Sequence, residues 1–136
     1  MMWILWAVGA IASFMLMLQA WIWLQTRRMR GRPAPDTAHV DGAAAAARVR
    51  VYYFYGAHCS HCRSMTPLVD RLRESHHNLI KLDIADARDL AQAFGVAATP
   101  GLVQVVDGVI RRVQLGGMSE ARLLALLTSP VSGQGI

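Results

Sequence analysis

The 136-residue sequence has no charged side chain between Trp3 and Leu24, and it has only two cysteines. The absence of charge leaves an apolar run interrupted only by Ser13 and Gln19, and about 20 apolar residues in a helix span the hydrocarbon core of a bilayer. A buried core helix is excluded, because the remaining chain is too short to cover such a helix on all sides. We therefore predict a transmembrane anchor over residues 1–25.

The two ends of this segment favour an uncleaved anchor over a signal peptide. No Lys or Arg precedes the apolar run, whereas a signal peptide begins with a positive region and has a shorter apolar core. Tryptophan rings favour the headgroup region of a membrane. Both ends of the segment carry them: Trp3, Trp6, Trp21 and Trp23.

Positive charge is concentrated directly after the apolar run, at Arg27, Arg28, Arg30 and Arg32. Such flanks stay in the cytoplasm and attract anionic lipid headgroups. The bias predicts a single-pass protein of the cell (inner) membrane with its C-terminal part in the cytoplasm; the periplasm is the alternative. Residues 48–128 carry ten basic and seven acidic side chains, a mixture without the basic stripe of a nucleic-acid binder. No nucleic-acid partner is expected.

Residues 26–47 are predicted to be a linker, basic at first and then rich in proline and alanine. Pro33, Pro35 and the alanines of residues 43–47 show no apolar periodicity, although these alanines can form a short helix. Residues 129–136 are predicted to be a flexible tail. The linker separates the anchor from a domain predicted over residues 48–128.

Within this domain, apolar runs and helical spacing alternate along the chain. Asp86 is a candidate cap for the second helix, Gly95 a candidate terminator of that helix, and Ser119 a candidate cap for the last one. Asp107-Gly108 is a typical hairpin turn. Strands are predicted at 49–55, 79–84, 102–106 and 109–115, and helices at 59–76, 88–94 and 119–127.

The predicted order is β-α-β-α-β-β-α. A strand-helix-strand unit normally forms a right-handed crossover between parallel strands, and the hairpin adds an antiparallel pair. The fold class is therefore α/β, with a mixed four-stranded sheet and helices on both faces.

The only cysteine pair lies in Cys59-Ser60-His61-Cys62, between the first predicted strand and the first predicted helix of the domain. Two cysteines at this spacing can form a disulfide. A helix N-terminus stabilises the thiolate that attacks other disulfides. Half a zinc site is the alternative, but closing a tetrahedron with His58 and His61 would strain so short a segment. We predict a redox-active centre with no metal and no cofactor.

These residues resemble the thioredoxin family over nearly all of residues 48–128. The resemblance rests on Cys-Ser-His-Cys together with a set of dispersed positions: Pro67, Lys81-Leu-Asp-Ile84, Phe94-Gly95-Val96, Thr99-Pro100, Asp107-Gly108 and Gly116. It implies a minimal thioredoxin-like fold. It also implies a cis Pro100 beside the disulfide, with Thr99 and Pro100 binding an extended substrate segment.

Two positions depart from the common thioredoxin pattern, and a matching lysine is affected by one of them. His58 replaces a tryptophan, Tyr53 stands where a buried aspartate is common, and Lys81 has lost that aspartate as its expected partner. Proton transfer to and from Cys62 is therefore assigned to His58, His61 or water. His61 resembles the histidine of the periplasmic disulfide-forming oxidases, and Thr99 resembles that of the periplasmic isomerases. Both resemblances favour the periplasm, against the arginine bias.

The leading hypothesis is a membrane-anchored thiol–disulfide oxidoreductase. Cys59 attacks a protein substrate and Cys62 resolves the mixed disulfide, so the catalytic residues would be Cys59, Cys62, His61 and His58. Its partners would be protein thiols or disulfides and a recycling protein that resets the pair. The alternatives are a non-catalytic module for binding and assembly, or a redox sensor at the membrane.

Overall fold

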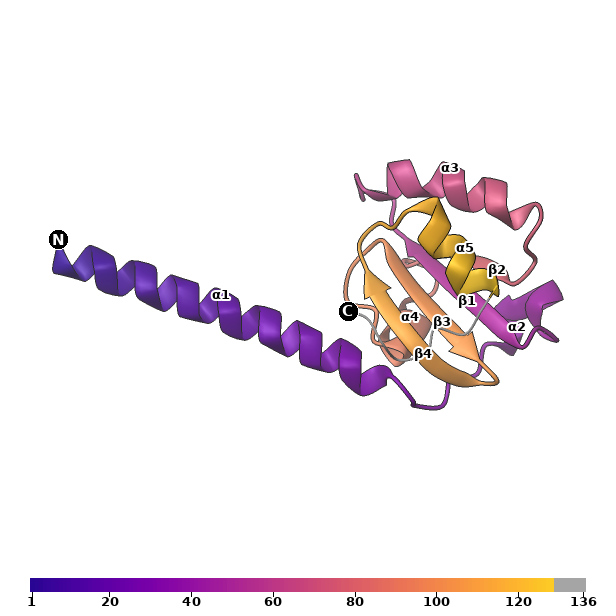
Figure 1. Ribbon diagram of the computed structural model, residues 1–136, viewed down its shortest axis with the longest axis horizontal. Coiled ribbons are helices and arrows are strands. Elements are labelled where there is room, and N and C mark those ends of the chain that lie inside the picture. The colour runs from indigo at the N-terminus through magenta and orange to yellow at the C-terminus, as the bar shows by residue number, and fades with distance from the viewer. Residues whose placement is uncertain (129–136) are drawn as a thin grey trace.

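The computed structural model describes residues 1–128; the predicted tail, residues 129–136, lies outside the described residues. A long helix, α1 (Met2–Met29), precedes a compact α/β unit (Figure 1). The elements after α1 are α2 (Ala38–Asp41), a 3-10 turn (Gly42–Ala44), β1 (Val49–Tyr55), α3 (Cys62–Arg73), β2 (Leu79–Asp83), α4 (Arg88–Phe94), β3 (Gly101–Val106), β4 (Val109–Leu115) and α5 (Glu120–Thr128).

The four strands form one mixed sheet in the order β2-β1-β3-β4. β1 pairs in parallel with β2, so that Tyr53 lies opposite Lys81, and it pairs antiparallel with β3. β3 and β4 form the predicted hairpin around Asp107 and Gly108, with a register shift between Gln104 and Val105. The predicted element order and sheet type are confirmed.

Helices cover both faces of the sheet because β1 alternates its buried side chains between them. Val51 and Tyr53 pack against α3 and α5, whereas Tyr52 and Phe54 pack against α4 and the segment before β1. Figure 1 shows α3 and α5 on one side of the sheet and α4 on the other. Phe94 of α4 and Met65 of α3 are both buried in this core.

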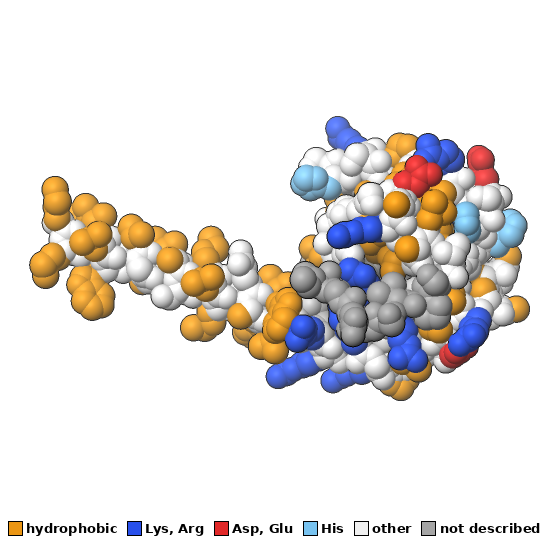
Figure 2. Space-filling model, viewed as in Figure 1, with side chains coloured by type: hydrophobic (Ala, Val, Ile, Leu, Met, Phe, Trp, Pro, Cys, Tyr) orange, Lys and Arg blue, Asp and Glu red, His pale blue; other side chains and the backbone are white. Residues whose placement is uncertain are grey.

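α1 has no buried residue along its whole length. Figure 1 shows it leaving the folded unit as a single rod, and Figure 2 shows hydrophobic side chains along it. By length and composition it could span a membrane. The helix continues to Met29 and not to residue 25, because the arginines after the apolar run do not oppose helix formation and Met29 packs against the core beneath Gly95.

The segment after α1 pairs with the edge of the sheet instead of crossing solvent as a spacer. Gly31 donates its N–H to the carbonyl of Ile110 at 2.7 Å, and the Ile110 N–H donates to the carbonyl of Arg32 at 2.9 Å. Ala34 then donates to the carbonyl of Gly108 at 2.8 Å. These bonds occupy the first residues of the outer strand β4, so the chain leaving α1 is held against the domain.

A buried polar cluster holds the next part of this segment. The Asp41 carboxylate accepts hydrogen bonds from the hydroxyl of Tyr52 at 2.6 Å and from the hydroxyl of Thr37 at 2.7 Å, and it pairs with Arg50. Asp41 and Thr37 are 6% and 4% exposed. This stretch of the predicted linker is therefore packed against the domain. Its packing depends on polar contacts with β1. Such contacts produce no periodic pattern of apolar residues in the sequence.

Two helix boundaries also differ from the predicted ones. α3 begins at Cys62, because Cys59 to His61 form a turn before it, and it ends at Arg73. The cap of α4 is Ala87 without a side-chain hydrogen bond, because Asp83 and not Asp86 accepts a backbone N–H in this turn. Two other predicted boundary signals are confirmed. Gly95 ends α4 in the left-handed conformation, and the Ser119 hydroxyl accepts a hydrogen bond from the first turn of α5.

Candidate active site

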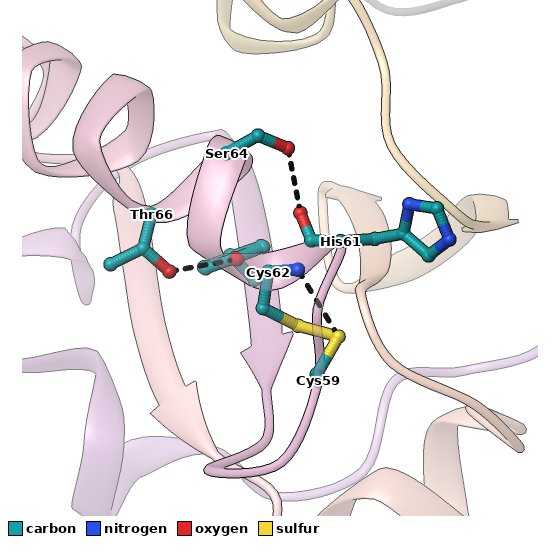
Figure 3. Close-up of a disulfide and its surroundings, with 6 residues drawn as sticks. Cys59, His61, Cys62, Ser64 and Thr66 are labelled. Atoms are coloured by element: carbon teal, nitrogen blue, oxygen red, sulfur yellow. Dashed lines mark hydrogen bonds between the residues drawn. A yellow bond between two sulfur atoms is a disulfide. The ribbon is translucent and has the colours of Figure 1, made fainter.

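Cys59 and Cys62 form a disulfide, with their Cα atoms 5.2 Å apart (Figure 3). The backbone N–H of Cys62 points at the sulfur of Cys59, with an N to Sγ distance of 3.2 Å. Cys62 is only 3% exposed, whereas Cys59 is half-buried. Cys59 is therefore the sulfur that an outside molecule can reach more easily.

The local sequence explains this geometry. β1 ends at Tyr55. The Cys59 N–H donates to the carbonyl of Gly56 at 3.3 Å, and this turn takes the chain out of the sheet. α3 then starts at Cys62, with His61 as its N-cap residue. Cys59 consequently lies at the N-terminus of α3, where the helix carries partial positive charge and the Cys62 N–H donates to its sulfur.

His58 and His61 are exposed on either side of Cys59. In Figure 3 the His61 ring points away from the disulfide, and the His61 carbonyl accepts a hydrogen bond from Ser64 at 2.9 Å. Both rings are exposed, so a bound partner can contact them. Their predicted roles as proton carriers stay predictions.

Thr99 and Pro100 lie beside the loop that carries the disulfide. The peptide bond between them is cis, as the resemblance implies. A Cβ placed at Gly56 would meet the Thr99 hydroxyl oxygen at 3.4 Å, which locates Thr99 against the turn between β1 and Cys59. Pro100 is buried, and its carbonyl accepts the N–H of Gly116 at 2.8 Å. This fixes the loop before β3 next to the candidate site.

Tyr53 stands at the position of the missing aspartate and packs against α3. It is fully buried and its hydroxyl pairs with that of Thr66 at 3.1 Å. Thr66 is four residues beyond Cys62, so it lies one helical turn further along the same face of α3. Burial raises the pKa of Tyr53 above its ordinary value. The phenol remains neutral at physiological pH and supplies a hydroxyl where a carboxylate would supply a base.

Lys81, which lacks the common aspartate as its partner, pairs instead with Asp70. Its ammonium lies 3.0 Å from a carboxylate oxygen of Asp70 on α3 and 5.0 Å from the centre of the Tyr55 ring. The sequence alone did not identify Thr66 and Asp70. Their spacing could have identified them. Cys62, Thr66 and Asp70 recur every four residues and therefore share one face of α3.

No metal centre emerges in the part of the chain that the structure describes: no group of three or more His, Cys, Asp or Glu side chains is placed to hold an ion. Both sulfurs are engaged with each other. The site can therefore carry out chemistry that cycles between a disulfide and two thiols.

Comparisons with known proteins agree with this geometry. The thioredoxin family profile matches residues 37–129. A thioredoxin of Echinococcus granulosus is 30% identical over 76 residues, which cover 51% of this chain and 71% of that protein. The TPR repeat-containing thioredoxin TDX of Arabidopsis thaliana is 32% identical over 73 residues, 52% of this chain.

A solved structure of a mutant thioredoxin from Halobacterium salinarum superposes with a TM-score of 0.61 at 27% identity, covering 73% of this chain and 88% of that one. The shared part is the domain and not the whole of every relative. This chain spans 19% of the Arabidopsis protein and 54% of a Streptomyces coelicolor relative.

Proposed function

Because the chain belongs to the thioredoxin family and holds a disulfide at the start of α3, we propose that it is a membrane-anchored thiol–disulfide oxidoreductase acting on protein substrates. One observation carries the proposal. The Cys62 N–H donates to the sulfur of Cys59, and Cys59 is the more accessible of the two cysteines. The same N–H and the α3 N-terminus would stabilise a thiolate at Cys59 in the reduced protein.

The exchange proceeds in two balanced steps. The Cys59 thiolate attacks one sulfur of a substrate disulfide, forming a mixed disulfide and releasing the other substrate sulfur as a thiolate, which takes up a proton. Cys62 then loses its proton and attacks the Cys59 sulfur, which releases the second substrate thiol and closes the Cys59–Cys62 disulfide. Two electrons pass to the substrate. A recycling dithiol protein returns two electrons to the pair, and the reverse sequence oxidises a substrate dithiol.

The two cysteines provide a matched pair of variants for testing this order of attack. Cys59→Ser should abolish reduction of a disulfide-containing protein, because no nucleophile remains at the accessible position. Cys62→Ser should accumulate a covalent adduct with the substrate, because the first step proceeds and the second cannot. Adducts are counted on non-reducing gels. Equal trapping by both variants would contradict the assignment of Cys59 as nucleophile.

A double serine variant distinguishes catalysis from the binding-module alternative. A module that only holds a partner would keep its biological activity without either sulfur, whereas an oxidoreductase would lose it. Titration of the purified chain against defined dithiol and disulfide ratios should also show one reversible two-electron step. The lack of that step would refute the proposed exchange activity.

We further propose that α1 anchors the protein in the cell inner membrane with the domain in the cytoplasm. Support comes from the uncharged surface of residues 3–24 and from the arginines that follow it, seen in Figure 2 where α1 meets the domain. An alkaline phosphatase fused after Ile136 should be inactive and a fluorescent protein at the same point should be bright. An active phosphatase would place the domain in the periplasm instead.

A further inference from the structure

A pocket of about 390 Å³ lies between the end of α1 and the outer part of the domain, within the range of roughly 300–1,000 Å³ typical of ligand sites. One wall is the last three turns of α1, and the other is the second half of β4 with the start of α5. The lining residues are Gln19, Ile22, Trp23, Thr26, Arg27, Arg30, Arg112, Val113, Gln114, Leu115 and Arg122.

Positive charge dominates one side of this pocket. Four arginines from three elements line it, and no Asp or Glu is among its described lining residues. Burial lowers the pKa of Arg112, and the neighbouring charges of Arg30 and Arg122 lower it further. These guanidinium groups are therefore close enough for one anionic group to interact with more than one of them.

The other side of the pocket is apolar and continues along α1. Ile22 and Trp23 face Val113 and Leu115, and the Arg27 guanidinium stacks over the Trp23 ring at 3.9 Å. With a rise of about 1.5 Å per residue, α1 advances about 16 Å between Gln19 and Arg30. In a spanning helix this stretch leads from inside the hydrocarbon core, near its edge, into the headgroup layer.

We propose that this pocket binds the phosphate-bearing headgroup of an anionic phospholipid. The arginines bind the phosphate oxygens, for which the planar guanidinium offers paired N–H donors. The apolar wall contacts the glycerol and the first acyl carbons. A bound lipid of this kind would join α1 to β4 and α5, and so fix the domain against the bilayer surface.

A phospholipid fits the whole lining better than a free phosphate does. Inorganic phosphate would use the arginines and leave Ile22, Trp23 and Leu115 without a partner. The inference rests on the proposed membrane anchoring and is independent of the exchange chemistry. A Cys59→Ser/Cys62→Ser chain should therefore bind the lipid as the native chain does, which separates failure of this site from failure of the redox assignment.

The test is lipid binding by the full chain purified in a neutral detergent, followed by native mass spectrometry. Three titrants are compared: phosphatidylglycerol, phosphatidylcholine and inorganic phosphate. Phosphatidylglycerol should bind at least about tenfold more tightly than either of the others, since one charge-assisted hydrogen bond accounts for a factor of this size.

Two double variants with the same loss of charge locate the effect. Arg30→Gln/Arg122→Gln removes two lining arginines and should weaken phosphatidylglycerol binding at least about tenfold. Arg28→Gln/Arg111→Gln removes two exposed arginines that adjoin the lining residues Arg27 and Arg112 in sequence but lie outside the pocket, and should change binding by less than about twofold. Equal weakening by both pairs, or equal affinity for inorganic phosphate, would overturn the proposal.

Discussion

Replacing Asp41 by alanine tests whether the segment before β1 belongs to the folded domain. In the native chain the carboxylate accepts the hydroxyls of Tyr52 and Thr37 and pairs with Arg50, whose side chain is only 15% exposed. The Arg50 Nε already lies buried without a hydrogen-bond partner among the described residues. Asp41→Ala would leave the rest of the guanidinium buried without its counter-charge.

The expected cost follows from burial. Removing one partner of a buried, hydrogen-bonded ion pair lowers the free energy of unfolding by about 3–5 kcal/mol, mostly because the remaining charge stays desolvated. A small domain has a total stability of only about 5–15 kcal/mol. The corresponding fall in Tm is about 12 °C or more, at roughly 4 °C per kcal/mol.

Unfolding can be followed by near-ultraviolet circular dichroism, because Tyr52, Tyr53 and Tyr55 are the chain's three tyrosines and all lie in β1. The full chain in detergent is the sample, and Asp36→Asn, an exposed acid in the same segment, is the matched control. Asp36→Asn should change stability by less than about 0.5 kcal/mol. A loss below about 1 kcal/mol for Asp41→Ala would refute the reasoning and restore the spacer prediction.

Three further perturbations address other contacts. Gly95→Ala should destabilise by about 1–2 kcal/mol in thermal unfolding, because φ is +77° and the added Cβ would lie 2.6 Å from Met29. Asn78→Ala should cost about 1–3 kcal/mol in urea unfolding, because its amide bridges carbonyls of β1 and α5. Burial raises the pKa of both Tyr52 and Tyr53. Their contribution to stability should therefore be complete below about pH 10 and decline as pH rises above it.

Each of these has a control. Gly117→Ala should be tolerated, because its Cβ would make only an ordinary 3.7 Å contact, and equal losses at the two glycines would contradict the argument. Gln92→Ala, on the exposed side of α4, should leave urea unfolding unchanged where Asn78→Ala does not. Ultraviolet titration should show Tyr52 and Tyr53 ionising at a higher pH in the folded chain than in the denatured chain; ionisation at the same pH in both states would count against the pKa directions.

The sheet and its helices could be predicted because their signals are local. The run of residues 49–55 and the helical spacing of Met65, Val69 and Leu72 reflect burial of one face of each element. The Cys59–Cys62 disulfide could also be predicted, because two cysteines separated by two residues have few other chemical roles. Contacts between elements gave no such signal. Lys81 meets Asp70 only because β2 and α3 cross in space.

The segment of residues 31–44 shows the limit most clearly. Its hydrogen bonds to β4 are made by backbone groups, which no side-chain pattern records. Its buried side chains, Thr37 and Asp41, are polar residues that a sequence argument assigns to the surface. The start of α3 could not be located for a similar reason, because the turn from Cys59 to His61 has the same residue types as a helix beginning.

The pairing of residues 31–34 with β4 also determines how the disulfide meets other molecules. β1 and β4 are each antiparallel to β3 and so run in the same direction. The disulfide follows the end of β1, and α1 extends from the start of β4 toward its end. With α1 across a bilayer, the exchanging sulfur is held at a set height on the membrane-facing edge. A domain held in this way reaches a smaller volume than one on a flexible tether. Which partners it can react with therefore depends on the distance of their cysteines from the lipid surface.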